Sequence, residues 1–266
     1  MRRKLVWGNW KMNGSAAANA ALPGSLAMHA KSIAGRVDVG VCVPAVYLEQ
    51  DRRELAGATA AWGVQDVSAH ECGAYTGEIS EHMVSEFGAT YAIVGHSERR
   101  INHGETGATI GEKARQALSA GLVPVVCVGE SEAQRDAGIA EEYVCVQLTA
   151  VLNVLAPGQA ERIVVAYELV WAIGTGRSAT AAQAQSMHAA IRVCLRARGG
   201  RQANVRLLYG GSVNPGSAYE LFRCEDVDGG LVGGASLKSA DFIQIIGAAT
   251  GATGAMEQAH PTCEAS

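Results

Sequence analysis

Hydrophobic residues along the chain gather in short runs that are rich in β-branched side chains and apolar throughout, instead of alternating with polar residues. A continuous apolar run is typical of a parallel strand that is buried on both faces. The pattern therefore predicts eight buried parallel strands, at Leu5–Trp10, Val37–Val43, Thr59–Gln65, Thr90–Gly95, Leu122–Val128, Arg162–Tyr167, Val205–Tyr209 and Gly229–Val232.

Longer amphipathic stretches separate these runs and predict helices over residues 16–34, 45–57, 79–88, 105–120, 139–156, 180–199, 216–223 and 238–249. Some of them carry start signals. Thr180 precedes an alanine-rich run, and Asn214-Pro215 places a proline early in the seventh helix. A strand followed by a helix eight times, without a second compositional zone, predicts a single-domain (β/α)8 barrel over residues 1–250.

An open, doubly wound sheet is the competing architecture. It predicts a glycine-rich phosphate fingerprint after the first strand, whereas that strand leads here into Gly8-Asn-Trp-Lys-Met-Asn-Gly14. Dinucleotide binding is disfavoured for the same reason. Residues 251–266 are small, polar and aperiodic, and they predict a flexible C-terminal tail.

Composition and charge narrow the classes of partner. The chain is 48% hydrophobic and 18% charged, which is ample apolar material for one core. Its net charge is −4 and no basic stripe occurs, so we expect no nucleic-acid partner. Asn9 and Lys11 break the first apolar stretch too early for a signal peptide, and the longest apolar run, Leu122–Val128, is too short to span a membrane. We therefore expect a cytoplasmic protein without a membrane partner.

The cysteines are scattered, odd in number and free of any C-x-x-C pair, which argues against a disulfide framework or a zinc cluster. They are Cys42, Cys72, Cys127, Cys145, Cys194, Cys224 and Cys263. We interpret them as reduced thiols of a cytosolic protein that mostly fill the core, with Cys127 as a packed thiol of the fifth strand.

Polar residues just after the predicted strands identify a candidate site, because these positions gather at one mouth of a barrel. They are Asn9 and Lys11 after the first strand, His96 and Glu98 after the fourth, Glu168 after the sixth, and the turns Gly210-Gly211-Ser212 and Gly233-Gly234 after the last two. Together they supply a cation, a histidine, a carboxylate and glycine-rich turns around one cavity.

The chemistry of this set favours proton abstraction. It lacks a nucleophile–base pair, and the seven histidines form no H-x-x-x-H or H-x-H pattern, so a metal site is disfavoured. One carboxylate base with donors that polarise a carbonyl suits proton removal from the adjacent carbon and support of an enediolate. Glycine turns at this end of many barrels bind a phosphate dianion. The residues therefore predict a small phosphorylated carbonyl substrate.

Five segments carry a resemblance to a known family. They are Gly8-Asn-Trp-Lys-Met-Asn-Gly14, Val94-Gly-His-Ser-Glu-Arg-Arg100, Ala166-Tyr-Glu-Leu-Val-Trp-Ala-Ile-Gly-Thr-Gly176, Tyr209-Gly-Gly-Ser212 and Leu231-Val-Gly-Gly-Ala-Ser236. In order, and from about residue 4 to 249, they resemble triosephosphate isomerases, which have the (β/α)8 TIM-barrel fold. The resemblance implies a cytoplasmic homodimer of glycolysis and gluconeogenesis that interconverts dihydroxyacetone phosphate and D-glyceraldehyde 3-phosphate without a cofactor or metal.

The resemblance also implies a role for each matching residue. Glu168 would be the base that moves a proton between C1 and C2, and His96 the electrophile that donates to the substrate oxygens, aided by Asn9. Lys11 would bind the substrate and stabilise the enediolate, with Glu98 beside it. The backbone amides that would hold the phosphate are those of Gly174, Ser212, Gly233 and Gly234. The N–H groups of a short helix predicted from Ser97 would disfavour an imidazolium at His96.

Two loops gain a role from the same resemblance. The segment Leu169, Val170, Trp171, Ala172, Ile173, Gly174, Thr175 and Gly176 resembles a hinged lid that closes over the phosphate and excludes water. The segment Ala74-Tyr-Thr-Gly-Glu-Ile-Ser80 resembles the loop that docks into the partner subunit. By this resemblance the chain is a homodimer through Tyr75–Glu78, and Thr76 braces the partner's site.

The chain departs from the family pattern at Leu169, where proline is usual. Proline fixes φ near about −65° and biases the preceding residue, here Glu168, toward extended conformations. We predict that leucine leaves the base less well positioned, which lowers turnover more than substrate binding. The main rival function is a non-catalytic phosphate-binding barrel, and the intact trio of Lys11, His96 and Glu168 argues against it. A second rival is another sugar-phosphate isomerase, but those barrels use carboxylate or cysteine acid–base pairs.

Overall fold

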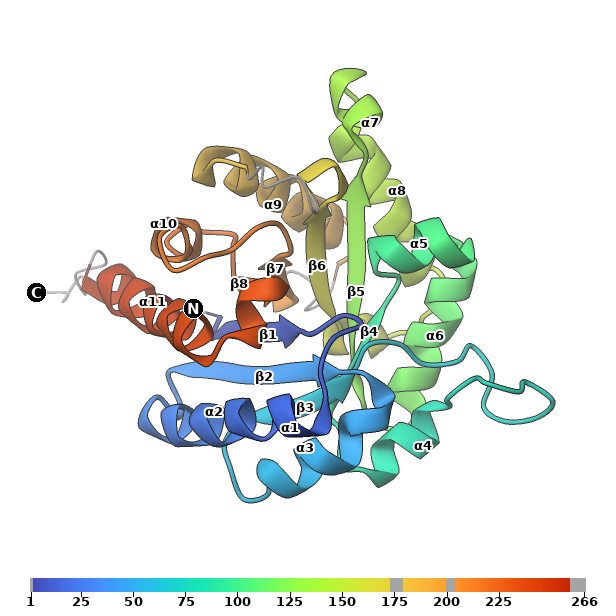
Figure 1. Ribbon diagram of the computed structural model, residues 1–266. Helices are drawn as coiled ribbons and strands as arrows, with labels where there is room; N and C mark the ends of the chain where they lie inside the picture. The colour runs from blue at the N-terminus through green and yellow to red at the C-terminus, as the bar shows by residue number, and fades with distance from the viewer. Residues whose placement is uncertain (1, 173–178, 200–203, 259–266) are drawn as a thin grey trace, which may run out of the picture.

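The chain folds into a closed barrel of eight parallel strands (Figure 1). A computed structural model describes residues 2–172, 179–199 and 204–258. The strands pair in sequence order, and β1 also pairs with β8, which closes the sheet and confirms the predicted (β/α)8 barrel. They are β1 Lys4–Asn9, β2 Val37–Val43, β3 Ala61–Val64, β4 Tyr91–Val94, β5 Val123–Glu130, β6 Val164–Leu169, β7 Arg206–Tyr209 and β8 Gly229–Val232.

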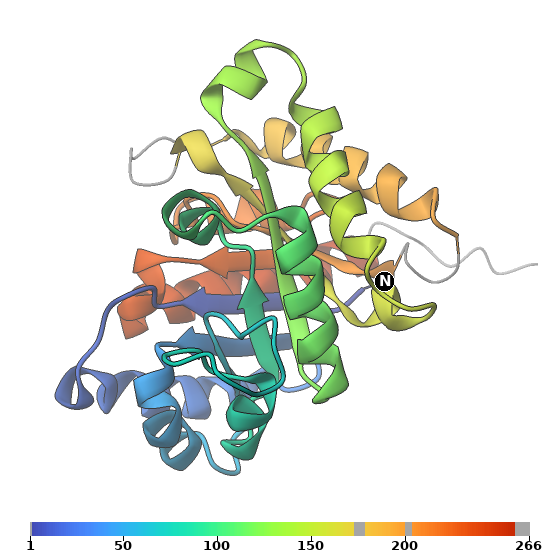
Figure 2. The same ribbon diagram turned by 90° about the vertical axis from the view of Figure 1, so that its right-hand side faces the viewer.

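Helices surround the barrel (Figures 1 and 2). They are α1 Ala16–Asn19, α2 Ala21–Ser32, α3 Leu48–Glu54, α4 Glu81–Glu86, α5 Ser97–His103, α6 Gly107–Ser119, α7 Glu132–Asp136, α8 Ala140–Leu152, α9 Ala181–Arg196, α10 Ala218–Phe222 and α11 Ser239–Gln258, with short 3-10 helices η1 Ala45–Tyr47, η2 Gln159–Arg162, η3 Val170–Ala172 and η5 Gly234–Leu237. Within the described ranges, none of these helices has both the length and the apolar character needed to cross a membrane.

Some helix boundaries differ from the predicted ones for local reasons. Helix α7 is an addition to the pattern, and it begins with a capping box in which Ser131 and Gln134 each accept the other's backbone N–H. Helix α10 begins at Ala218 and not at Pro215, because the Asn214 side chain accepts the N–H groups of the next turn and holds it apart from the helix.

The C-terminal helix is longer than the hydrophobic pattern predicts. Helix α11 continues to Gln258, beyond residue 249 where the pattern ends the last helix, so residues 251–258 of the predicted tail are helical. Alanine and glycine supply little periodic signal, which hid this extension from the sequence pattern. The rest of the predicted tail, residues 259–266, lies outside the described residues.

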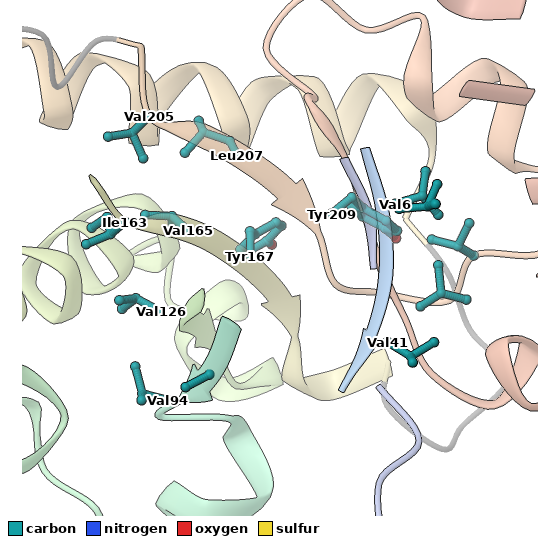
Figure 3. Packing of buried hydrophobic residues seen from close by; sticks show 14 of the residues in the cluster. Val6, Val41, Val94, Val126, Ile163, Val165, Tyr167, Val205, Leu207 and Tyr209 are labelled. Atoms are coloured by element: carbon teal, nitrogen blue, oxygen red, sulfur yellow. The ribbon is translucent and has the colours of Figure 1, made fainter. Parts of the chain in front are cut away.

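Alternate residues of each strand divide the core into two layers. Inward-facing side chains fill the barrel, and the members of this inner cluster are Leu5, Trp7, Cys42, Ile93, Val125, Cys127, Val164, Ala166, Leu208 and Leu231. Outward-facing ones, including Val165, Tyr167, Leu207 and Tyr209, pack in a larger cluster with the helices (Figure 3). This period of two decides which strand residues can reach the barrel mouth.

Glycine allows the inner layer to accommodate its largest side chain. A Cβ added to Gly40 on β2 would lie 2.3 Å from the Trp7 ring, so the indole fits only because that position carries no side chain. The Trp7 ring also contacts the Tyr91 ring at a centroid distance of 4.1 Å. The interior is therefore a packed core, and space for a small molecule lies at its carboxyl end.

Candidate active site

A cavity of about 500 Å³ lies at the carboxyl ends of the strands. Its lining combines residues from β1, β4, β6, β7 and β8: Asn9, Trp10, Lys11, Asn13, His96, Glu168, Ala172, Gly210, Gly211, Ser212, Val213, Asn214, Leu231, Gly233, Gly234 and Ala235. The structure thus brings together the polar residues that the sequence places after the first, fourth and sixth strands, with the two glycine turns. Glu98 joins the group through its contact with Lys11.

The end of β1 holds Lys11 in an unusual backbone conformation. Lys11 has a φ of 52°, the left-handed region that a residue with a side chain rarely adopts. Two neighbours fix it there: the side-chain oxygen of Asn9 accepts the Lys11 N–H at 3.0 Å, and Gln65 Nε2 donates to the Lys11 carbonyl at 2.8 Å. These two hydrogen bonds maintain the strained backbone conformation of Lys11, whose side chain lines the cavity.

The turn after β4 orients both His96 and Glu98. His96 caps helix α5, and its Nδ1 accepts the backbone N–H of Glu98 at 3.2 Å. Because Nδ1 accepts a hydrogen bond, the ring proton of the neutral histidine resides on Nε2, which faces the cavity side. The Glu98 carboxylate in turn pairs with Lys11, at 2.6 Å between Oε1 and Nζ.

Glu168 projects inward because it shares the inward face of β6 with Val164 and Ala166. Its carboxylate is buried and uses both oxygens: Oε1 lies 2.8 Å from His96 Nε2, and Oε2 accepts the Ser97 N–H at 2.8 Å. The neighbouring strand comes very close, since a Cβ added to Gly129 would lie 2.0 Å from the Glu168 carbonyl. Glycine at position 129 therefore allows β5 to approach the Glu168 backbone closely.

The pKa of His96 is set by burial and by two neighbouring carboxylates. Burial lowers the pKa, but the charge and hydrogen bond of Glu168 raise it more, and Glu98 adds to this effect, so the net pKa is above the ordinary value. The contribution expected from the N–H groups of α5 acts in the opposite direction, and it stays a prediction. A ligand that separates Glu168 from Nε2 removes the main cause of the raised pKa.

The glycine turns form the opposite wall. Gly233 leads into η5, and Ser236 closes the turn by donating from both its N–H and its hydroxyl to the Gly233 carbonyl, at 2.8 Å and 2.7 Å. A Cβ on Gly234 would meet no atom within 4 Å, so this residue faces open space. Ser212 lines the cavity as well. Gly174, the fourth residue predicted to hold a phosphate, lies outside the described residues.

The predicted lid is described only at its start. Leu169 is the last residue of β6 and is fully buried, and Val170, Trp171 and Ala172 form η3. Ile173, Gly174, Thr175 and Gly176 lie outside the described residues. Trp171 Nε1 donates to Glu130 at 3.1 Å, which ties the beginning of this segment to the end of β5.

Glu130 was missed by the sequence reasoning, although it ends β5 just as Glu168 lies at the end of β6. It is fully buried and accepts hydrogen bonds from Arg135, the Tyr167 hydroxyl and Trp171. Gln65, which follows β3, was missed in the same way. The signal for both is the one that identifies the other site residues, namely a polar residue at the carboxyl end of a buried strand.

The loop that contains Tyr75–Glu78 does not reach the cavity of its own subunit. It extends away from the barrel between β3 and α4 (Figure 1), and Thr76 is exposed. Two aromatic rings, His70 and Tyr75, stack at 3.8 Å and stiffen it. Among the described residues, no group of three or more His, Cys, Asp or Glu side chains is placed to hold a metal ion.

Comparisons with known proteins agree with this geometry. Residues 4–249 match the family described as triosephosphate isomerase. The triosephosphate isomerase of Cupriavidus necator is 56% identical over 246 residues, which cover 92% of this chain and 99% of that protein. That of Herminiimonas arsenicoxydans is 54% identical over 250 residues, 94% and 100% of the two chains. The crystal structure of triosephosphate isomerase from Bartonella henselae superposes with a TM-score of 0.82 at 38% identity, covering 92% of this chain and 98% of that one.

Proposed function

The chain belongs to the triosephosphate isomerase family and is an isomerase of triose phosphates, and on this premise we propose how its residues interconvert dihydroxyacetone phosphate and D-glyceraldehyde 3-phosphate. The reaction moves one proton between neighbouring carbons and one between neighbouring oxygens. It therefore needs a base beside the carbons, a donor beside the oxygens, and positive charge for the enediolate.

Glu168 is the proposed base and His96 the proposed electrophile. The observation that carries this assignment is the 2.8 Å contact between Glu168 Oε1 and His96 Nε2 in the wall of the cavity. A substrate oxygen that accepts the Nε2–H takes the place of the carboxylate, which is then free to face the adjacent carbon. Because Nδ1 accepts from Glu98 N, the ring keeps the tautomer that donates from Nε2.

Lys11 and Asn9 supply the remaining polar groups toward the substrate. The Lys11 ammonium lies in the cavity wall and stabilises the negative charge of the enediolate, while Glu98 holds it in place at 2.6 Å. Asn9 is buried beside it and aids the histidine. Neither a cofactor nor a metal takes part in this proposal.

The phosphate group is proposed to bind on the glycine wall. Backbone N–H groups of Ser212, Gly233 and Gly234 would hold it, together with Gly174. Two observations support this assignment: all three described residues line the cavity, and the position of a Gly233 Cβ lies 3.8 Å from Lys11 Cε, so the ammonium is close to the same wall. A dianion there gains from both the backbone dipoles and the lysine.

Leu169 is proposed to weaken the hinge of the lid. Its fully buried side chain packs in the outer core layer, directly after the base, and the backbone restraint that proline would add at this position is absent. We also propose, from the family resemblance, that residues 169–176 form a lid that excludes water.

A homodimer is proposed through the loop around Tyr75–Glu78, with Thr76 bracing the partner's site. Large apolar side chains are exposed on this loop, on the helix α4 that follows it, and in the segments after β1 and β2: Tyr75 and Ile79, Met83, Met12 and Val46. An assembly would remove them from water, which favours association. We further propose that the enzyme acts in glycolysis and gluconeogenesis in the cytoplasm.

The deciding experiment is steady-state isomerisation of glyceraldehyde 3-phosphate by the parent and by Glu168→Gln. The substitution keeps the shape but removes the base, so kcat is expected to fall roughly 10²–10⁴-fold with an unchanged melting temperature. Glu112→Gln on α6, a half-buried glutamate that pairs with Arg115 on the same helix, is the matched control and should retain full activity. Equal turnover by Glu168→Gln and the parent would rule out Glu168 as the base. A folded parent that binds phosphate ligands but turns over nothing would favour the non-catalytic barrel.

A further inference from the structure

The described cysteines differ in burial. Cys42 and Cys127 are buried, Cys72 is exposed, and the other three are half-buried. Of these three, Cys194 and Cys224 pack against the hydrophobic core, so four of the six described cysteines lie in the core or against it. Two of the half-buried thiols, Cys145 and Cys194, are neighbours in space although 49 positions separate them in the sequence.

Helices α8 and α9 bring these two residues together. Cys145 lies in α8 and Cys194 in α9, and the two helices run side by side on the outside of the barrel (Figures 1 and 2). Cys194 Sγ lies 3.9 Å from the Cys145 carbonyl and 4.0 Å from Thr149 Oγ1, one turn further along α8. The thiol of Cys194 is thus held against the backbone that carries Cys145.

The two side chains also contact each other and remain reachable from solvent. Burial raises the pKa of Cys145 to about 12, and a hydrogen bond with the Cys194 side chain contributes to the shift. Both cysteines are half-buried, so neither thiol is enclosed in the core as those of Cys42 and Cys127 are.

We propose that Cys145 and Cys194 form a dithiol site that a low-molecular-weight disulfide, such as oxidised glutathione, converts to an interhelical disulfide. In the first exchange, the Cys194 thiolate attacks a glutathione sulfur, because the raised pKa of Cys145 disfavours a thiolate there. The glutathione S–S bond breaks, and one glutathione thiolate leaves. In the second, the other cysteine attacks the mixed disulfide and releases the second glutathione. Two protein thiols are oxidised, one disulfide is reduced to two glutathione thiols, and the two protons pass to the leaving thiolates.

The bridge would join the helices on either side of β6. Helix α8 leads into this strand and α9 follows it, and β6 carries Glu168 at its end. A covalent link between residues far apart in sequence restricts the unfolded chain, so it stabilises the fold. Because neither sulfur touches the cavity, the oxidised enzyme is expected to keep its activity and to resist heat inactivation better. This inference does not depend on the proposed catalytic roles.

The test incubates the purified full-length protein with oxidised glutathione, blocks the remaining thiols, and maps tryptic peptides without reduction. Cleavage isolates Cys145 in residues 136–162 and Cys194 in residues 193–196, so the bridge yields one linked pair of peptides that reduction separates. The linked pair is expected in the parent and in Cys224→Ser, whose half-buried cysteine just after α10 is the matched control. It is expected to be missing from Cys145→Ser and Cys194→Ser.

Thermal unfolding provides the second measurement. The oxidised parent is expected to unfold about 5 °C or more above the reduced protein, whereas oxidation of Cys194→Ser should give no such increase. A parent in which Cys145 and Cys194 each carry glutathione, or remain free while Cys72 reacts, would overturn the proposal. The peptide map of the parent alone decides this, so the conclusion does not require the variants to fold.

Discussion

The two ends of the barrel both pair charged side chains, but the pairs at the amino end are buried, whereas those at the carboxyl end border the cavity. At the amino end, the fully buried Arg192 pairs with Asp228 at 2.6 Å, and Asp228 also accepts from Arg2 at 2.8 Å and from the Leu207 N–H at 2.9 Å. At the carboxyl end, the Lys11–Glu98 pair is 30% and 43% exposed, and Glu168 rests against a histidine in an open cavity.

The difference separates stability from chemistry. Removal of one partner from a buried ion pair leaves an unpaired buried charge, which strongly lowers the stability of the fold. An exposed ion pair contributes little to stability. The carboxyl-end charges are held by backbone strain, a helix start and a strand end, so a substrate can replace one partner without unfolding the site. Substitutions at the two ends should therefore affect different measurements.

The largest effect is expected at the amino end. Arg192→Met leaves Asp228 buried with one fewer cation, and the free energy of unfolding should fall by about 3–5 kcal/mol in urea titrations. Arg196→Met, which removes an exposed arginine of the same helix, is the control and should stay within about 0.5 kcal/mol of the parent. The kcat of the folded Arg192→Met fraction should match the parent. A stable Arg192→Met variant that has lost activity would contradict the assignment of the amino-end charges to stability.

The buried carboxylate of Asp51 provides a comparison with the paired carboxylate of Asp228. Asp51 in α3 is fully buried, both its oxygens lack hydrogen bonds among the described residues, and burial raises its pKa to about 7. The folded protein keeps this group neutral while the unfolded chain ionises it above pH about 4. Stability is therefore lost as the pH rises from about 4 to 7, by about 4 kcal/mol in total.

Asp51→Asn tests this pH dependence. The variant cannot ionise, so its stability relative to the parent should increase between pH 4 and pH 8 and then remain constant, as measured by denaturant midpoints across that range. Glu54→Gln, which changes an exposed carboxylate of the same helix, should give a nearly flat difference. A flat profile for Asp51→Asn would show that the carboxyl finds a partner or water in solution.

At the carboxyl end the expected loss is in rate. Lys11→Met removes the cation beside the cavity, and kcat/KM should fall by about 10²–10³-fold, or about 3–4 kcal/mol of transition-state stabilisation. The melting temperature should hardly change, because the pair with Glu98 is partly exposed. Lys31→Met, at an exposed position of α2, serves as the control. A large loss of stability in Lys11→Met would remove the distinction between the two ends.

The smallest effect is expected at Leu169. Leu169→Pro should raise kcat a few-fold with little change in KM, because proline restrains the backbone next to Glu168. The leucine side chain is part of the core, so unfolding must be measured in parallel to separate lost packing from altered turnover. An unchanged or lower kcat in a fully folded variant contradicts the proposed weakening of the hinge.

Much of the fold could be predicted because the signals are local. Strands β2 and β8 begin and end at the predicted residues, Val37–Val43 and Gly229–Val232, because short buried runs define them. The polar residues after strands located the site for the same reason. Helix α7 depends on a capping box that was not considered, and the end of α11 lacks hydrophobic periodicity.

What could not be predicted depends on contacts between distant elements. The pKa of His96 follows from Glu168, 72 positions away, and its sign cannot be read from the helix that His96 caps. The left-handed conformation of Lys11 is held by Gln65, and the Cys145–Cys194 contact by the packing of two helices. In each case the local sequence supplies the side chain, and the tertiary structure supplies the partner.

The pairing of β1 with β8 has a consequence for how the chain is made. The Leu5 N–H donates to the Asp228 carbonyl at 2.8 Å, so the first strand completes its hydrogen bonds only with residues that are synthesised 223 positions later. Until then both margins of the growing sheet are open to strands of other chains. Emerging chains should therefore depend on chaperones until about residue 232, and a permuted gene that begins between β4 and β5 would shift that vulnerable interval to another pair of strands.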